Sequence, residues 1–294
     1  MGSLGKERQF AEIEITPSVL RELQLIQLEC LTELDRVCRE NNINYSLDGG
    51  TLLGSVRHGG FIPWDDDIDI IMLREDYEKF FNICKTELDT DRFFLQEHRT
   101  DPYYNVGYSR LRRNNTLYRR AGHEHMKYHN GVFIDIFVLD NVPDGKIVRK
   151  LHRFSCFCIR KILWSKTGRK LAPTFLSRVW FSIVSLVPMN FAFRCNDRIA
   201  KSCNKKKTEL VRHNTHPYPN PKVCGYGIPA ELADEFTELE FEGRKFMAVK
   251  EYDRYLTMLY GDYMKLPPKE KQKPSVHLSE FKGIREETKV EGDT

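Results

Sequence analysis

The chain has 294 residues, of which 40% are hydrophobic and 30% are charged, and its formal net charge at pH 7 is +4. This composition is typical of a folded globular protein and excludes a disordered chain. The opening residues, "MGSLGKERQF", contain no apolar stretch of the kind a secretion signal needs. The eight cysteines are scattered and show no CxxC spacing, so we expect buried free thiols in a reducing, cytoplasmic setting.

The first predicted element is a long helix. Thr16 and Pro17 provide an N-cap and a first-turn proline, and leucines then recur at helical spacing as far as Glu40. Residues 43–48, "INYSLD", predict a short strand after that helix.

A glycine turn follows this strand. Gly49 and Gly50 precede residues 51–56, which predict one or two helical turns. The free N–H groups at the start of those turns would face back towards the glycines.

The next predicted strand carries acidic residues. Residues 67–72 alternate acidic and aliphatic side chains, so Asp67 and Asp69 share one face and the aliphatic residues occupy the other. The pattern separates a polar site from an apolar core. A helix at 74–88 and a strand with a turn at 101–115 are predicted to follow.

A further alternating strand is predicted at residues 131–140. On one of its faces Asp135 lies between Phe133 and Phe137 and is the lone carboxylate. A buried carboxylate without a charged partner is unfavourable, so we expect a partner for Asp135. The alternative is a strand-end aspartate bonded to a turn.

A basic, aromatic region comes next. Residues 145–196 contain eleven Lys and Arg residues and no acid, interleaved with aromatic and aliphatic side chains. This composition suits helices that rest on an anionic membrane surface. A polyanion-binding face and a helical subdomain with a solvated basic face are the alternatives. The longest uncharged run, residues 179–193, is interrupted by Pro188 and is too short to cross a bilayer.

The C-terminal part begins with a proline- and glycine-rich connection at residues 216–229. A hairpin or strand at 241–249 and a helix at 252–260 are predicted next. From Leu266 the sequence is polar, and we expect its last dozen residues to be disordered. We divide the chain into a catalytic core (1–144), a basic helical insertion (145–215), a C-terminal part of the catalytic domain (216–268) and a polar, partly disordered tail (269–294).

The acidic strands predict metal-dependent phosphoryl chemistry. Carboxylates on two strands can hold Mg²⁺ or Mn²⁺, which neutralises phosphate charge in the transition state. The glycine turn lets backbone N–H groups approach a phosphate, and Arg57 is a candidate phosphate clamp. Trp64, Tyr103, Tyr104 and Tyr108 are candidate rings for an aromatic cage around a quaternary ammonium.

The sequence contains two other candidate metal sites. An EF-hand loop that starts at Asp65 would place Ile70 at the required glycine and Asp76 at the required glutamate, which disfavours calcium binding. His123, His125 and His129 have spacings compatible with a transition-metal site, and the alternative is a polar loop that faces an acceptor.

Residues 45–80, "YSLDGGTLLGSVRHGGFIPWDDDIDIIMLREDYEKF", resemble the LicD family of phosphocholine transferases, a branch of the nucleotidyltransferase-fold proteins that also includes fukutin-related enzymes. Residues 131–140 look like the second acidic strand of that family, and residues 241–268 are similar to its closing motif.

This resemblance implies an α+β fold, with a small nucleotidyltransferase-like mixed sheet flanked by helices and a basic helical insertion. It implies that the catalytic and metal-binding residues are Asp67, Asp69 and Asp135, with Mg²⁺ or Mn²⁺ as the cofactor. Sequence leaves open whether Asp135 is a metal ligand or a general base. The expected substrate-binding residues are Gly49, Gly50, Thr51, Arg57, His58 and Trp64.

The implied reaction transfers a phospho-alcohol, typically phosphocholine from CDP-choline, to a sugar hydroxyl. The expected acceptor is a glycan or lipid-linked glycan precursor of the teichoic acid, lipopolysaccharide or capsule type. The expected partners are a CDP-alcohol and an anionic membrane at the inner face of the cell, with no nucleic acid. The alternatives are a DxD glycosyltransferase that uses a nucleotide-sugar and a noncatalytic membrane- or polyanion-binding module.

Overall fold

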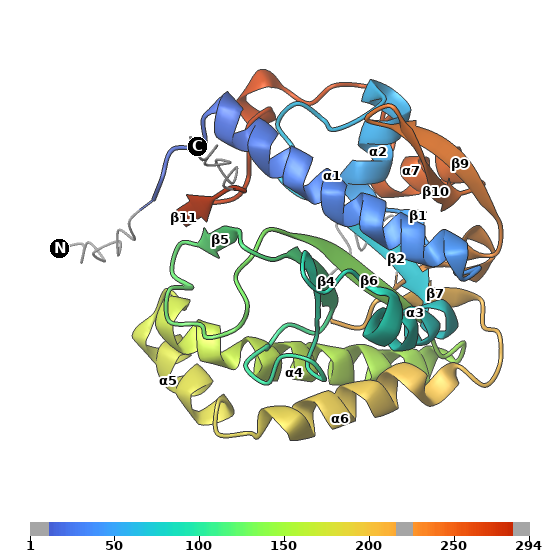
Figure 1. Ribbon diagram of the computed structural model, residues 1–294. Helices are drawn as coiled ribbons and strands as arrows, with labels where there is room; N and C mark the ends of the chain where they lie inside the picture. The colour runs from blue at the N-terminus through green and yellow to red at the C-terminus, as the bar shows by residue number, and fades with distance from the viewer. Residues whose placement is uncertain (1–11, 216–225, 285–294) are drawn as a thin grey trace.

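The computed structural model describes residues 12–215 and 226–284. Its centre is a mixed sheet of seven strands, in which the order β1-β2-β6-β4-β3 is extended by β7 beside β6 and by β8 beside β7 (Figure 1). β2 and β6 run parallel, and the other neighbouring strands of this sheet run antiparallel. These strands are β1 (Ser46–Leu47), β2 (Asp69–Leu73), β3 (Phe93–Gln96), β4 (Ser109–Arg113), β6 (Phe133–Asn141), β7 (Leu210–Arg212) and β8 (Ile228–Pro229).

Two further sheets of two strands each lie beside this sheet. β9 (Phe236–Phe241) pairs with β10 (Arg244–Val249), and β5 (Leu117–Arg120) pairs with β11 (Leu278–Lys282). The second pair joins segments about 160 residues apart in the chain.

Helices flank the sheet on both faces. They are α1 (Pro17–Glu40), α2 (Gly49–His58), α3 (Arg74–Glu87), α4 (Lys146–Leu171), α5 (Phe175–Val184), α6 (Met189–Ala200) and α7 (Tyr252–Tyr260), with short 3₁₀ turns at Lys201–Cys203, Ala230–Ala233 and Lys269–Lys271.

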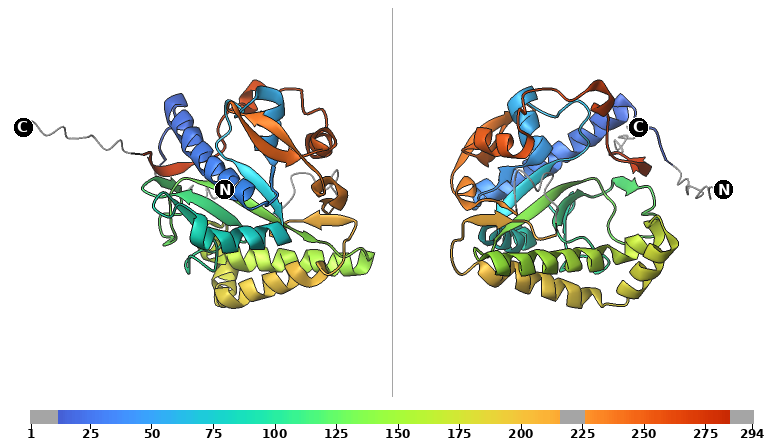
Figure 2. Two further views of the ribbon diagram at one scale, coloured as in Figure 1. Left: turned by 45° about the vertical axis from the view of Figure 1, so that its right-hand side comes forward. Right: turned by 180° about the vertical axis from the view of Figure 1, so that it is seen from behind.

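The main core lies between the sheet and helices α1 and α3. Leu111 of β4 and Ile134 and Ile136 of β6 point into it and are completely buried. The opposite face of β4 and β6 carries Arg110 and Phe133 and faces α4. Figure 2 shows α4, α5 and α6 as a layer on the side of the molecule away from α1.

Several predicted elements are confirmed. The side chain of Thr16 accepts a hydrogen bond from the Val19 backbone N–H, and α1 ends at Glu40 as predicted. The helix predicted at 74–88 and that at 252–260 are α3 and α7, and the segment 241–249 belongs to the β9–β10 hairpin. α2 begins at Gly49 and ends at His58, so it is longer than the predicted 51–56 at both ends.

The predicted mixed α+β sheet with flanking helices is confirmed, and residues 145–215 contain α4, α5 and α6. β11 was not predicted from the polar C-terminal segment. Most of the connection at 216–229 and most of the last dozen residues lie outside the described residues.

Neither a disulfide nor a single spanning helix occurs in the described part of the chain. Seven cysteines are free thiols, of which four are buried as expected and Cys158, Cys195 and Cys203 are only half-buried. Cys224 lies outside the described residues. No single described helix is long and apolar enough to cross a membrane. By length and composition alone, Phe175–Val184 and Met189–Cys203 would meet that requirement only as a pair bent by 82°.

Candidate active site

The two strands with acidic residues lie side by side. Because β2 and β6 are parallel neighbours, Asp69 lies directly beside Asp135, and the Asp135 backbone N–H donates to the Ile68 carbonyl at 2.9 Å. Both carboxylates therefore project from the same face of the sheet. This juxtaposition agrees with the two-strand site predicted from the sequence.

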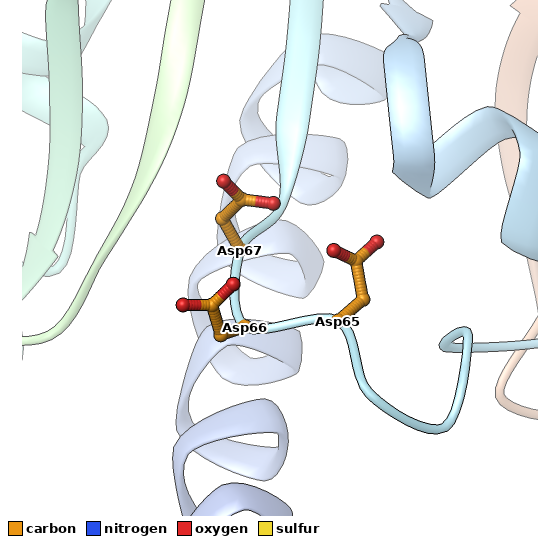
Figure 3. A group of neighbouring side chains, drawn as sticks. All are labelled: Asp65, Asp66 and Asp67. Carbon is orange, nitrogen blue, oxygen red and sulfur yellow. The ribbon is translucent and has the colours of Figure 1, made fainter. Parts of the chain in front are cut away.

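Three consecutive aspartates precede β2. Within the described residues, Asp65, Asp66 and Asp67 are the one group of three or more metal-ligand side chains whose ligand atoms all lie within 4.8 Å of one another. Figure 3 shows the carboxylates of Asp65 and Asp67 on one side of the loop, with that of Asp66 turned away from Asp65. The polar site is thus formed by the loop together with the start of β2.

Asp66 has a separate set of partners. Its carboxylate accepts hydrogen bonds from the Val276 backbone N–H at 2.9 Å and from the Ser275 hydroxyl at 3.2 Å. Its backbone carbonyl accepts from the Gln27 amide at 3.0 Å. Asp66 therefore ties the loop to α1 and to the C-terminal segment, whereas Asp65 and Asp67 face the site.

The carboxylates are crowded enough to disfavour their charged forms. Burial and the negative charges of Asp67 and Asp66 raise the pKa of Asp65 to about 8. Burial and the charges of Asp66 and Asp135 raise the pKa of Asp67 to about 6. The pKa of Asp69 is also well above its usual value, because the side chain is buried beside Asp67 and Asp135.

This donor set fits a hard divalent cation. Carboxylate oxygens are the ligands that Mg²⁺ and Mn²⁺ prefer, and a bound cation would compensate the repulsion that raises these pKa values. Asp67, Asp69 and Asp135 are the residues predicted to hold it, and the structure adds Asp65 as a fourth candidate.

The N-terminus of α2 lies against the same carboxylates. The Thr51 hydroxyl accepts a hydrogen bond from the Asp69 backbone N–H at 2.9 Å, which fixes the helix to the start of β2. Gly49 has a φ of +52°, and a Cβ there would lie 3.5 Å from Asp69 Oδ2. A Cβ on Gly50 would lie only 2.6 Å from Asp65 Oδ2, so the absence of a side chain keeps this approach open.

Helix α7 contributes residues that sequence reasoning missed. The Tyr255 hydroxyl donates to Asp48 Oδ1 at 2.6 Å, and Asp48 is the residue that precedes α2. The Tyr260 hydroxyl lies 3.6 Å from the position of a Cβ on Gly49. Burial and the nearby carboxylates, Asp48 and Asp69 first among them, raise the pKa of Tyr260, so this hydroxyl stays protonated and can donate.

The expected charged partner of Asp135 is Arg110. Its Nε lies 2.7 Å from Asp135 Oδ1, and both side chains are more than nine-tenths buried. The expectation of a partner is confirmed, and the turn-bonded alternative is wrong. The sequence signal for this pair is weak, since Arg110 lies in the polar, aromatic stretch at 101–115, for which only a strand and a turn are predicted.

Two predicted substrate-binding residues lie farther along α2, and a third, Trp64, lies in the loop that follows it. Arg57 and His58 occupy the last turn of α2, about 12 Å along the helix axis from Gly49. The Arg57 guanidinium donates to the Tyr263 carbonyl at 2.8 Å, and Trp64 meets the His58 ring edge to face at 6.4 Å. Their contact with substrate stays a prediction.

The three histidines are not a metal cluster within the described residues. His129 Nε2 lies 3.1 Å from the Asn114 amide oxygen, and its Nδ1 accepts from the Gly131 backbone N–H. His123 Nδ1 lies 3.1 Å from the Tyr128 hydroxyl. The transition-metal interpretation of these histidines is therefore not supported.

Comparison with known proteins identifies the family. The profile of the LicD/FKTN/FKRP nucleotidyltransferase domain matches residues 42–144. The chain is also 33% identical over 283 residues to the lipopolysaccharide cholinephosphotransferase LicD of Haemophilus influenzae, which covers 89% of this chain and 97% of that protein. The chain belongs to the LicD family.

A more distant relative shares part of the matched region. Human ribitol 5-phosphate transferase FKRP is 38% identical over 68 residues, which is 21% of this chain and 14% of that protein. The LicD-family profile spans α2, the aspartate loop, β2 and Asp135 but ends before α7, so the tyrosines of α7 lie outside it.

Proposed function

We propose that this protein transfers a phospho-alcohol, specifically phosphocholine from CDP-choline, to a sugar hydroxyl of a cell-surface glycan precursor. The observation that carries the proposal is the convergence of Asp67, Asp69 and Asp135 beside the Gly49–Gly50 N-terminus of α2. The match with the LicD cholinephosphotransferase over nearly the whole chain supports it.

In the proposed step, the acceptor hydroxyl oxygen attacks the phosphorus that bears choline. A new P–O bond forms between the acceptor oxygen and this phosphorus. The bond between this phosphorus and the bridging oxygen of the diphosphate breaks, and CMP leaves. The hydroxyl proton passes to a base, for which Asp135 is the candidate. We assign the backbone N–H groups at the start of α2 and the Tyr260 hydroxyl as hydrogen-bond donors to the phosphate oxygens of CDP-choline.

We further propose that the cofactor is Mg²⁺ or Mn²⁺, held by Asp67 and Asp69 with Asp65 or Asp135. When bound, the ion would neutralise the diphosphate and the departing CMP. The contact from Arg110 occupies one oxygen of Asp135 and fixes the orientation of the carboxylate.

The names of the relatives indicate the class of donor and acceptor. One relative is named for choline phosphate and lipopolysaccharide and another for ribitol 5-phosphate, so both CDP-choline and CDP-ribitol deserve testing. A nucleotide-sugar remains the alternative donor for a DxD-type glycosyltransferase.

The place of action that we propose is the cytoplasmic face of a membrane. Thirteen of the twenty exposed large hydrophobic side chains in the described residues belong to residues 145–196, the same region that has eleven basic residues and no acid. Positive charge combined with exposed apolar side chains matches an anionic lipid surface. The most exposed members include Ile147, Phe154, Phe175, Leu176 and Leu186.

The deciding experiment measures CMP release from CDP-choline, CDP-ribitol and a nucleotide-sugar in the presence of Mg²⁺ or Mn²⁺, with a crude glycan precursor as acceptor. We expect Asp67→Asn to reduce CMP release from CDP-choline by more than about 100-fold, because a metal-binding carboxylate is lost. Asp91→Asn, at an exposed position outside the site, serves as the matched control.

Consumption of the nucleotide-sugar alone would replace the proposal with a glycosyltransferase. Release that persists in Asp67→Asn would contradict the assigned role of the carboxylates.

A further inference from the structure

A cavity of about 310 Å³ lies between α4 and the sheet face that carries Asp135. β4, β5 and β6 form its floor, and α4, which passes beside them in Figure 1, contributes Arg160, Trp164 and Thr167 to its wall. The cavity adjoins the acidic site, because Arg110 lines it and also pairs with Asp135.

The cavity is lined by four arginines and by no acidic residue. These are Arg110, Arg112, Arg120 and Arg160. Arg110 is compensated by Asp135, whereas no ion pair within the described residues joins the other three to a carboxylate. The lining thus carries more positive than negative charge, although Asp135, outside the lining, also attracts Arg120.

Part of this charge is deeply buried. Arg112 is only 1% exposed, and its guanidinium donates to the Gln96 amide oxygen and the Gly131 carbonyl, which are both neutral. Burial and the neighbouring Arg110 lower the pKa of Arg112 to about 9. Within the described residues, Arg120 Nε and Thr215 Oγ1 are buried without a hydrogen-bond partner. Buried hydrogen-bond donors without a partner and buried cations without a counter-charge destabilise the folded protein unless a ligand supplies the missing hydrogen bond or negative charge.

The same geometry disfavours a choline headgroup in this cavity. The Arg110 guanidinium already lies over the rings of Phe133 at 3.8 Å and Tyr108 at 5.4 Å, and that of Arg112 lies 5.8 Å from the Tyr128 ring. The protein's own cations therefore occupy the aromatic faces, and a quaternary ammonium would be repelled.

We propose that this cavity binds a phosphate-bearing part of a sugar substrate, with Arg112, Arg120 and Arg160 as the anion contacts. Guanidinium groups match phosphate oxygens in pairs. The volume lies at the lower end of the range for small-molecule sites. This proposal rests on the proposed function, because the phosphate belongs either to the donor of that reaction or to a phosphorylated acceptor.

The test uses the full chain and inorganic phosphate as the probe. Trp164 lines the cavity, so phosphate should change tryptophan fluorescence in a saturable way that sodium chloride of equal ionic strength does not reproduce, and Trp164→Phe should abolish the change. Arg160→Gln should weaken phosphate binding about tenfold, because one charge-assisted contact is lost. Arg153→Gln, at an exposed position on the same helix, should bind as the unmodified protein does.

Saturation with CMP identifies the source of the phosphate. Displacement of phosphate by CMP assigns the cavity to the donor, and unchanged phosphate binding to the CMP-loaded protein assigns it to the acceptor. The proposal is overturned if no saturable signal appears, if Trp164→Phe retains the signal, or if both arginine variants bind equally. None of these readouts needs turnover, so failure of CDP-choline to release CMP would count against the proposed function alone.

Discussion

At the scale of single residues, the site is defined by carboxylates that repel one another. Asp65 and Asp67 share one side of their loop, while Asp66 is satisfied by Ser275 and Val276. A folded chain holds the first two together only at a cost in stability, and a cation is the natural compensation.

This repulsion predicts a pH dependence in metal-free protein. The pKa of Asp65 is raised from 3.8 to about 8 on folding, so the folded state retains a proton that the unfolded state has lost. The free energy of unfolding should therefore fall as the pH rises from about 4 to 8. Chemical denaturation after chelator treatment measures the fall, which Asp65→Asn should make shallower and Mg²⁺ should offset at pH 8.

The control for this experiment is Asp91→Asn, which should keep the full pH dependence. An identical fall in the unmodified protein and in Asp65→Asn would show that Asp65 is not the group responsible.

The role of a residue could be predicted where it depends on the order of residues within a single strand. Acidic–aliphatic alternation was enough to place Asp69 on the polar face of β2. Asp67 was predicted in the same strand but lies in the loop that precedes it, and Asp135 lies on a face of β6 that also carries Phe133 and Phe137. Tyr255 and Tyr260 gave no such signal, because they reach the N-terminus of α2 from about 200 residues away in the chain.

At the scale of elements, the C-terminal segment is part of the folded core. β11 pairs with β5, and Leu278 is completely buried beside Tyr118 and Phe133. The nearby Val276 N–H holds Asp66, so this strand supports the aspartate loop.

We expect Leu278→Ala to lower the free energy of unfolding by about 2–5 kcal/mol, because it removes a fully buried leucine. Urea denaturation monitored by circular dichroism measures the change. Lys282→Ala lies on the same strand at an exposed position and should change stability by less than about 0.5 kcal/mol. Equal, small effects of the two substitutions would show that β11 contributes little.

Element prediction succeeded where local signals were strong and failed where pairing is distant. The Thr16 cap and first-turn proline defined the start of α1, and the glycine turn marked α2. β11 was missed because its sequence, "LSEFK", is short and half polar, and its partner strand lies far away in the chain.

At the scale of the whole molecule, α4, α5 and α6 form an exposed layer on the side away from α1 (Figure 2). Its basic, apolar character was evident in the composition. Which apolar side chains remain exposed could not be predicted, because Phe181 and Phe193 are buried in the same layer in which Phe175 is 77% exposed.

The proposed membrane contact predicts sedimentation with vesicles of phosphatidylcholine and phosphatidylglycerol at low salt. Leu176→Glu should reduce the bound fraction severalfold, because a buried leucine contributes about 1.5–3 kcal/mol and the new charge is repelled by anionic lipid. Leu25→Glu, at an exposed position on α1, is the matched control and should bind as the unmodified protein does.

Protein that stays in the supernatant with anionic vesicles would contradict the membrane contact. Equal loss of binding in the two variants would place the contact on another surface.

Helix α4 has a consequence for the length of a substrate. One side of it lines the arginine-rich cavity through Arg160, and another side exposes Phe154 to the surroundings. If the exposed side lies on lipid, a single helix separates the cavity from the bilayer, a thickness of about 10–12 Å. An acceptor anchored in that bilayer would then need a spacer of roughly this length, the span of two or three sugar units, between its lipid and the group that enters the cavity.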